Sequence, residues 1–367
     1  MRAPAWLLSG FFVVVAAFAC GRTQVLRYIE PPIDAGVPDA GRDAGVDAGF
    51  DAGPPDAACE PRPVAFVAAV PTVMFVIDRS GSMQWDLSGN EYDGGRPSRW
   101  QVESQSLNQV LPPQDNKIAM GAVMFPSVAS QACDLPTSVD LSPALNNSAA
   151  LLRLFLVKPL GGTPTAGALQ VAANQLQGLH TASSARALVL TTDGAPNCNP
   201  NLNPNTCTCT VPLDPVTRVC GIVGNCLDDT VTLDTVRTLY QQDHLPTYVI
   251  GLASAQNPFN NVLDQMAIAG GVPRTGTGYR FYAVDQPADL TAALDRITAQ
   301  LTLCTYLSNT LPGINEKFVV KVGGTAVDAG TTGWEWADYA NGELVLHGAA
   351  CDSAAQGAVV SAVIECP

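Results

Sequence analysis

Histidine and positive charge are scarce in this chain of 367 residues. Its three histidines are His180, His244 and His347, and none lies beside a recognisable nucleophile motif, which disfavours histidine-based hydrolytic catalysis. Lysine and arginine total 19 against 33 acidic residues, and the net charge of −14 argues against binding a nucleic-acid backbone. Charged residues make up 14% of the chain, whereas the hydrophobic content of 47% is ordinary for a globular protein with an ample core.

An apolar run of comfortable membrane-spanning length, about 20 residues, is also lacking at the N-terminus. The stretch AWLLSGFFVVVAAFA follows Arg2 and ends directly before Cys20, so residues 1–20 have the pattern of a secretory signal peptide. The ending AAFAC resembles a bacterial lipobox, whose cysteine is lipidated and becomes the mature N-terminus. Because Gly21 rather than aspartate follows, the resemblance implies an outer-membrane lipoprotein of the bacterial cell envelope, held to the membrane by its N-terminal lipid. The alternative is a secreted protein that is cleaved after Ala19.

Residues 21–58 are predicted to form a disordered tether. Most of this segment, DAGVPDAGRDAGVDAGFDAGPPDA at 34–57, repeats an Asp-Ala-Gly unit interrupted by proline. A calcium-binding loop would need oxygen ligands at alternate positions and a closing glutamate, whereas alanine and glycine separate the acids here. A self-repelling chain with little to bury is expected to stay flexible and to lift a folded head off a membrane surface.

The chain has eleven cysteines, and setting Cys20 aside leaves ten, an even number that suits disulfide pairing in an oxidising compartment. Five of them lie between 198 and 226, so at least one must pair outside this segment if all are bridged, and Cys133 is the nearest candidate partner. The rival interpretation is a zinc or iron–sulfur site, which the spacing fits poorly because no paired C-x2-C pattern and no nearby histidine occur. Five bridges are expected: three within the group Cys133, Cys198, Cys207, Cys209, Cys220 and Cys226, without a direct Cys207–Cys209 pair, and two within the group Cys59, Cys304, Cys351 and Cys366.

Apolar strands and amphipathic helices alternate through the middle of the chain. This order predicts an α/β fold over residues 59–303, with a doubly wound, mostly parallel sheet that helices cover on both faces. The clearest helical stripe follows Pro287 and consists of Leu290, Ala293, Leu294, Ile297 and Leu301. Strands are expected at 73–77, 118–125, 187–191, 247–252 and 279–283, with an antiparallel edge strand near 138–141.

Beyond residue 303 the pattern changes to short β-like runs, such as KFVVKV, ELVLHG and AVVSAVIEC, with no helix between them. Residues 304–367 are therefore predicted to form a small β extension that disulfides hold together. Trp334 and Trp336 are expected to pack inside this extension rather than to recognise a ligand.

Polar residues follow two of the predicted strands directly. In VMFVIDRSGSM at 73–83, an apolar run is followed by Asp78, Ser80 and Ser82. In ALVLTTDG at 187–194, Asp193 follows a second apolar run. Between them GGTPTAGAL at 161–169 places Thr163 at a loop-to-helix junction. A polar turn is the simpler interpretation of each segment alone. Since ligands of open α/β sheets bind at the carboxyl ends of strands, we expect the three segments to meet at one edge.

The ordered set D-x-S-x-S, G-x-T-x-T and T-D-G resembles the von Willebrand factor type A (VWA) domain and its metal-ion-dependent adhesion site, over residues 70–303. The resemblance implies a Rossmann-like fold in which hydroxyls and two acids hold the ion, the acids directly or through water. Oxygen ligands suit Mg²⁺, with Mn²⁺ as a substitute. The implied ligands are Asp78, Ser80, Ser82, Thr163 and Asp193.

In this family the metal site binds protein ligands through an acidic residue. We therefore expect a surface- or envelope-anchored adhesion module that binds the carboxylate of a protein partner. We expect no enzymatic activity, because no general base is visible at the site and residues 304–367 show no nucleophile–base pair. The alternative is a structural envelope lipoprotein in which the metal only stabilises the loops.

Two insertions, at 84–98 and 197–226, each follow a segment of the metal site. Both are expected to project from the ligand-binding edge, where they serve as structural padding or set binding specificity.

Overall fold

The structure is a computed structural model that describes residues 60–68, 70–91, 93–127, 133–179, 185–211, 216–253, 255, 257–274, 276–330 and 332–366. The predicted signal peptide, the predicted tether, Cys59 and His180 lie outside the described residues. Within the described ranges, no helix combines the length and the apolar character that crossing a membrane requires.

A six-stranded sheet forms the centre of the fold, in the strand order β5-β4-β3-β6-β7-β8. β5 pairs antiparallel with β4, and all other neighbouring strands of this sheet pair parallel. The strands are β3 (Thr72–Asp78), β4 (Ala119–Phe125), β5 (Leu141–Ala144), β6 (Arg186–Thr192), β7 (Thr247–Leu252) and β8 (Tyr282–Val284). Nearly every side chain of β3, β4 and β6 is buried, which explains their continuous apolar runs. β5 and β8 each begin three residues later than expected.

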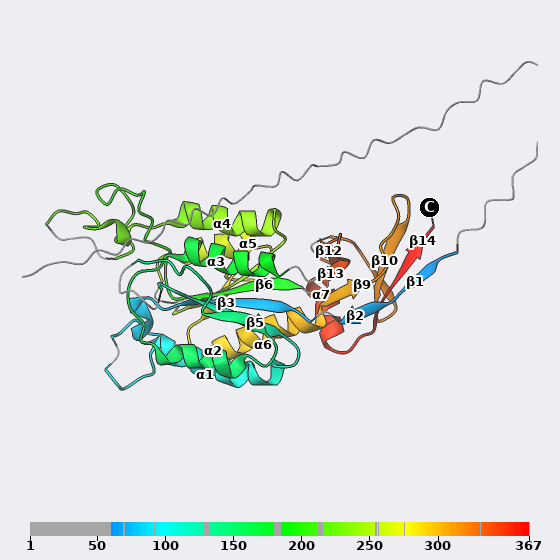
Figure 1. Ribbon diagram of the computed structural model, residues 1–367, viewed down its shortest axis with the longest axis horizontal. Coiled ribbons are helices and arrows are strands. Elements are labelled where there is room, and N and C mark those ends of the chain that lie inside the picture. Colours follow the sequence, from blue (N-terminus) through cyan, green and yellow to red (C-terminus); the bar gives the residue numbers. More distant parts are fainter. Residues whose placement is uncertain are drawn as a thin grey trace, which may run out of the picture. The chain divides into compact units, whose positions relative to one another are not determined.

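Helices cover both faces of this sheet, as Figure 1 shows. One face carries α1 (Arg99–Val110), α2 (Ser148–Arg153) and α6 (Pro287–Leu303), and the other carries α3 (Thr165–Gly178), α4 (Asp229–Gln241) and α5 (Asn260–Ala269). Short 3-10 helices are η1 (Gly81–Gln84), η2 (Pro112–Gln114), η3 (Leu154–Leu156) and η4 (Val223–Asn225). The five stripe residues of α6 are all buried. The predicted doubly wound α/β fold is confirmed.

β3 lies at the point where the strand order reverses. The chain runs from β3 to β4 on one side and returns at β6 on the other side. The loops after β3 and β6 therefore diverge at the carboxyl end of the sheet, which is where open α/β folds form a ligand-binding crevice.

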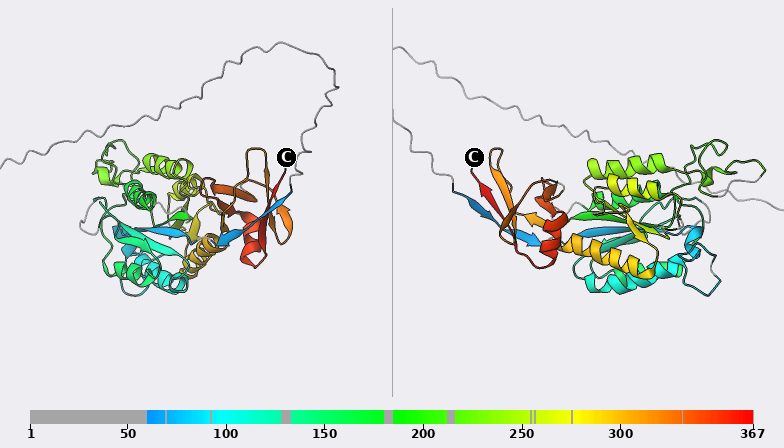
Figure 2. Two further views of the ribbon diagram at one scale, coloured as in Figure 1. Left: turned by 45° about the vertical axis from the view of Figure 1, so that its right-hand side comes forward. Right: turned by 180° about the vertical axis from the view of Figure 1, so that it is seen from behind.

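The C-terminal region contains two four-stranded antiparallel sheets and one helix, which Figure 2 shows from two sides. In the first sheet the order is β1 (Arg62–Val64), β14 (Val360–Glu365), β10 (Lys317–Val322) and β11 (Thr325–Val327). In the second the order is β12 (Trp334–Asp338), β13 (Glu343–Leu346), β9 (Thr305–Ser308) and β2 (Phe66–Ala68). Trp334 and Trp336 pack edge to face there, with ring centroids 5.7 Å apart.

Two predictions for this region need correction. The boundary between 59–303 and 304–367 does not hold, because β1 and β2 precede β3 in the chain yet pair with β14 and β9. The region also contains a helix, α7 (Gly348–Ala355). Its buried residues are the small Ala350 and Ala354, so it lacks the stripe of large apolar side chains by which helices are recognised. A disulfide joins Cys304, at the end of α6, to Cys351 in α7.

Candidate functional site

Asp78 is the last residue of β3 and is completely buried. Its Oδ1 accepts a hydrogen bond from the Ser80 amide at 2.7 Å, and its Oδ2 accepts one from the Thr192 hydroxyl at 2.6 Å. Burial and, to a lesser extent, the neighbouring Asp193 carboxylate raise the pKa of Asp78 to about 7. Two acids that repel one another at a buried strand end are a pair that a cation would stabilise.

The two predicted serine ligands connect Asp78 to Asp193. The hydroxyl oxygens of Ser80 and Ser82 lie 3.1 Å apart, and the Ser82 hydroxyl donates to Asp193 Oδ1 at 2.9 Å. η1 begins between these serines, at Gly81, so the chain turns tightly enough to point both hydroxyls toward the loop after β6. The result is a continuous set of oxygen atoms drawn from two strand ends.

Thr163 enters the same cleft from the loop that precedes α3. Its amide donates to Asn197 Oδ1 at 2.7 Å, and its carbonyl accepts from the Asn197 amide at 2.9 Å. Its hydroxyl makes no hydrogen bond to any residue that the structure describes, although Thr163 is only 5% exposed. The backbone of Thr163 is thus fixed while its hydroxyl stays available.

The structure brings together all five residues that the sequence selects as metal ligands. Four of them line one cleft, and Asp78 lies buried behind it. Their donor atoms are all oxygen, the type that Mg²⁺ and Mn²⁺ prefer. The repelling acids and the available Thr163 hydroxyl fit a divalent cation, and the role of these residues as its ligands stays a prediction.

Arg99 is a site residue that the sequence did not reveal. Its Nη1 donates to Asp193 Oδ2 at 2.5 Å, and its Nε donates to the Asp86 carbonyl at 3.1 Å. The guanidinium carbon also lies 5.7 Å from the centre of the Trp85 ring. Arg99 is the first residue of α1 and follows an insertion, so no spacing motif connects it with the distant TDG segment.

Glu103 lies one turn further along α1 and is completely buried. Its Oε1 accepts a hydrogen bond from the Thr191 hydroxyl, whereas Oε2 has no partner among the described residues. Burial raises the pKa of Glu103 to about 8. This acid is therefore largely protonated at neutral pH and adds little charge behind the site.

The cleft above these residues has a volume of about 700 Å³. One wall is the Cys-rich insertion at 197–226, which projects beyond the end of the sheet (Figure 1). Its disulfides are Cys207–Cys226 and Cys209–Cys220, and Cys198 pairs with Cys133. A Cβ atom at Gly162 would lie 2.4 Å from the Cys198 sulfur, so this last bridge packs directly against the residue before Thr163.

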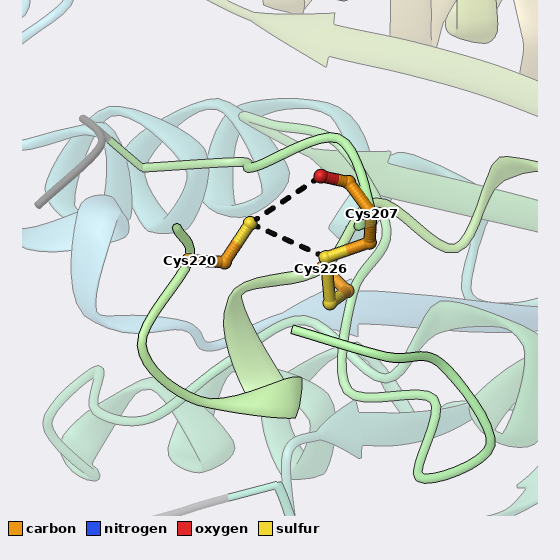
Figure 3. A group of neighbouring side chains, drawn as sticks. All are labelled: Cys207, Cys220 and Cys226. Atoms are coloured by element: carbon orange, nitrogen blue, oxygen red, sulfur yellow. Dashed lines mark hydrogen bonds between the residues drawn. A yellow bond between two sulfur atoms is a disulfide. The ribbon is translucent and has the colours of Figure 1, made fainter. Parts of the chain in front are cut away.

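The pairing decides between disulfides and metal in the insertion. The ligand atoms of Cys207, Cys220 and Cys226 lie within 4.8 Å of one another, and Figure 3 shows the Cys207–Cys226 bond among them. Cys220 is bonded to Cys209, so none of the three offers a thiolate to zinc. The predicted three bridges of this group are present. In the second group Cys304 pairs with Cys351, Cys366 is also in a disulfide, and Cys59 lies outside the described residues.

Comparison with known proteins confirms the VWA fold. The family model of the von Willebrand factor type A domain matches residues 73–195, which include all five predicted ligands. No curated protein sequence matches the chain.

Among solved structures, the PilB minor pilin from Streptococcus sanguinis is similar with 17% identity and a TM-score of 0.45, over 64% of this chain and 62% of the pilin. The vWF domain of the type V pili tip protein Mfa5 from Porphyromonas gingivalis has 15% identity and a TM-score of 0.41, over 63% of this chain and 94% of that domain. A von Willebrand factor type A protein from Catenulispora acidiphila has 12% identity and a TM-score of 0.39, over 84% of this chain and 62% of that protein. The chain thus spans less than two thirds of the pilin.

Proposed function

We propose that this protein, which has the fold of a VWA domain, is an envelope-anchored adhesion module that binds a carboxylate of a protein partner through Mg²⁺. The observation that carries the proposal is the charge balance at the site. Asp78 and Asp193 contribute −2 when ionised and Arg99 contributes +1, so a divalent cation brings the total to +1. A partner carboxylate would neutralise this remaining charge.

The proposed hydroxyl and carboxylate ligands have different roles. A bound Mg²⁺ would supply the positive charge and the open coordination position that attract an anionic oxygen. Ser80, Ser82 and Thr163 would bind it through neutral hydroxyls, which leave its charge largely uncompensated. Asp78 and Asp193 would balance part of that charge, directly or through water.

We propose binding rather than catalysis. Among the described residues that line the cleft, only Arg99 and Asp193 are charged, and they pair with each other. The lining therefore offers no free general base for acid–base chemistry.

Adhesion and location complete the proposal. The similar structures include a minor pilin and a pili tip protein, and surface adhesion agrees with a head that a lipid on Cys20 and a long acidic tether hold at the outer membrane. The structural alternative, in which the ion only stiffens loops, would need neither a partner nor an open coordination position.

The test uses the mature full-length protein, immobilised and exposed to solubilised envelope proteins. We expect capture of a partner in Mg²⁺, and release in EDTA. Capture should also be lost with Asp78→Ala and after the carboxylates of the envelope proteins have been converted to amides with carbodiimide and ethanolamine. If Mg²⁺ raises the melting temperature but no capture depends on it, the structural alternative is correct.

A further inference from the structure

We infer that the cleft binds an extended protein segment in which the metal-binding acid is next to a large apolar side chain. This inference rests on the proposed function and adds the second feature that the partner must have. It depends on the residues around the metal site, not on the site itself.

Three large apolar residues are exposed in the lining of the cleft. Ile222 is 63% exposed, Val211 41% and Trp85 40%. Single exposed apolar residues are ordinary on protein surfaces. Their concentration around a polar site is different, because apolar surface that surrounds a few polar groups is typical of a binding site.

Ile222 and Val211 belong to a wall that covalent bonds hold in shape. The insertion that carries them is closed by Cys207–Cys226 and Cys209–Cys220 and tied to residue 133 through Cys198. Next to Val211, the Thr210 hydroxyl donates to the Asn225 carbonyl at 3.0 Å and accepts from the Asn197 side chain at 3.2 Å. Apolar side chains on a preorganised wall bind a partner with a smaller loss of conformational entropy than those on a free loop.

The size of the cleft exceeds what one acidic side chain needs. Its volume of about 700 Å³ falls in the range of about 300–1,000 Å³ that holds whole ligands. The residues on either side of the partner's acid would therefore enter the cleft as well.

The charge of the residues that line the cleft determines which residues of the partner can lie beside its metal-binding acid. Apart from the Arg99–Asp193 pair, the described lining residues are apolar or neutral and polar. A basic or second acidic residue beside the partner's carboxylate would lose water without gaining an opposite charge. An aliphatic or aromatic neighbour instead finds Ile222 and Val211 on one wall and Trp85, which is held beside Arg99, in the same cleft.

The test is selection of random 12-residue peptides, displayed on phage, by the mature full-length protein in Mg²⁺, followed by elution with EDTA. We expect the eluted peptides to share an aspartate or glutamate adjacent to leucine, isoleucine, valine, phenylalanine or tryptophan. Replacing that acid by its amide in a selected synthetic peptide should abolish binding. The variants Ile222→Ser and Val211→Ser should each weaken peptide binding, and together by at least tenfold, with unchanged Mg²⁺ affinity in calorimetry.

Ile314→Ser is the matched control, because Ile314 is fully exposed in the C-terminal region and does not line the cleft. It should bind peptide as the unmodified protein does. Peptides that need the acid but accept any neighbour, or equal binding by Ile222→Ser/Val211→Ser, would overturn the inference and leave the proposed function standing. Equal EDTA-sensitive binding of polygalacturonate, an acidic polysaccharide, would overturn it too. If EDTA elutes no acid-containing peptide, both proposals fail.

Discussion

The Arg99 guanidinium and the Asp193 carboxylate form a buried ion pair, with 5% and 0% of their side chains exposed. The pair joins the start of α1 to the loop after β6, which are 94 residues apart in the chain. Arg99 would thereby compete with the proposed cation for Asp193, one of the predicted ligands, and would at the same time add positive charge that attracts an acidic partner.

Arg99→Gln should therefore have opposite effects on the two binding steps. Without the competing guanidinium we expect Mg²⁺ to bind more tightly, by roughly tenfold or about 1.4 kcal/mol. Partner capture should weaken, because the loaded site falls from +1 to zero. Calorimetry with Mg²⁺ and capture of an acid-containing peptide measure the two quantities. Arg96→Gln is the control, because it removes the same charge from an exposed side chain. The Nη1 atom of Arg96 lies 3.8 Å from Asp86 Oδ2. Weaker Mg²⁺ binding by Arg99→Gln would contradict the competition.

Asp78→Asn should lower the affinity for Mg²⁺ by at least about tenfold, because it removes one of the two charges that balance the ion. The metal-free protein should be as stable as the unmodified protein or more so at pH 8, since the repulsion between Asp78 and Asp193 is gone. The asparagine oxygen can still accept the hydrogen bond from the Ser80 amide. Thermal melting in EDTA and calorimetric titration test the two statements, and a large loss of stability in EDTA would show that Asp78 is structural.

Thr163→Ala should weaken partner capture more than it weakens Mg²⁺ binding. The resemblance to the VWA metal site implies that this threonine contacts the metal mainly when ligand is bound, and the Thr163 hydroxyl has no hydrogen-bond partner among the described residues. Thr163→Ser keeps the hydroxyl and should behave like the unmodified protein in both titrations. An equal loss of both affinities in Thr163→Ala would place the hydroxyl on the ion before the partner arrives.

The Cys133–Cys198 disulfide should act on partner binding through the Thr163 loop. Its sulfurs pack against Gly162, and Asn197, the neighbour of Cys198, holds both backbone polar groups of Thr163. The variant Cys133→Ala/Cys198→Ala should lose about 2–4 kcal/mol of stability and also bind partner several-fold more weakly. Removing Cys304 and Cys351 should cost similar stability without changing binding, because that bridge lies in the C-terminal region. Equal binding by both double variants would argue against this positioning role.

The metal-free protein should lose stability as the pH rises from about 5 to 8. Burial raises the pKa of Glu103 to about 8, above the ordinary 4.5, so across this window the folded state binds more protons than the unfolded state. The melting temperature in EDTA should fall by roughly 5 °C or more over that range. Glu103→Gln resembles the protonated acid, keeps the acceptor for Thr191 and should flatten the decline. An identical pH dependence in this variant would exclude Glu103 as its source.

The sequence alone determined the α/β fold, the five candidate ligands and the grouping of the cysteines around the insertion. These features are local. Buried parallel strands are continuous apolar runs, and Asp78 and Asp193 directly follow such runs, so the fold brings them to one edge whatever the loops do.

Only the tertiary structure decided how the site is held. The Arg99–Asp193 pair, the two bonds from Asn197 to Thr163 and the pairing of β1 with β14 join residues that are distant in the chain. The connectivity of the cysteines within their group is of the same kind. No sequence periodicity encodes such contacts, because they arise only when separately formed helices, strands and loops pack together. That packing depends on the path of each loop through space rather than on which residues are adjacent in the sequence.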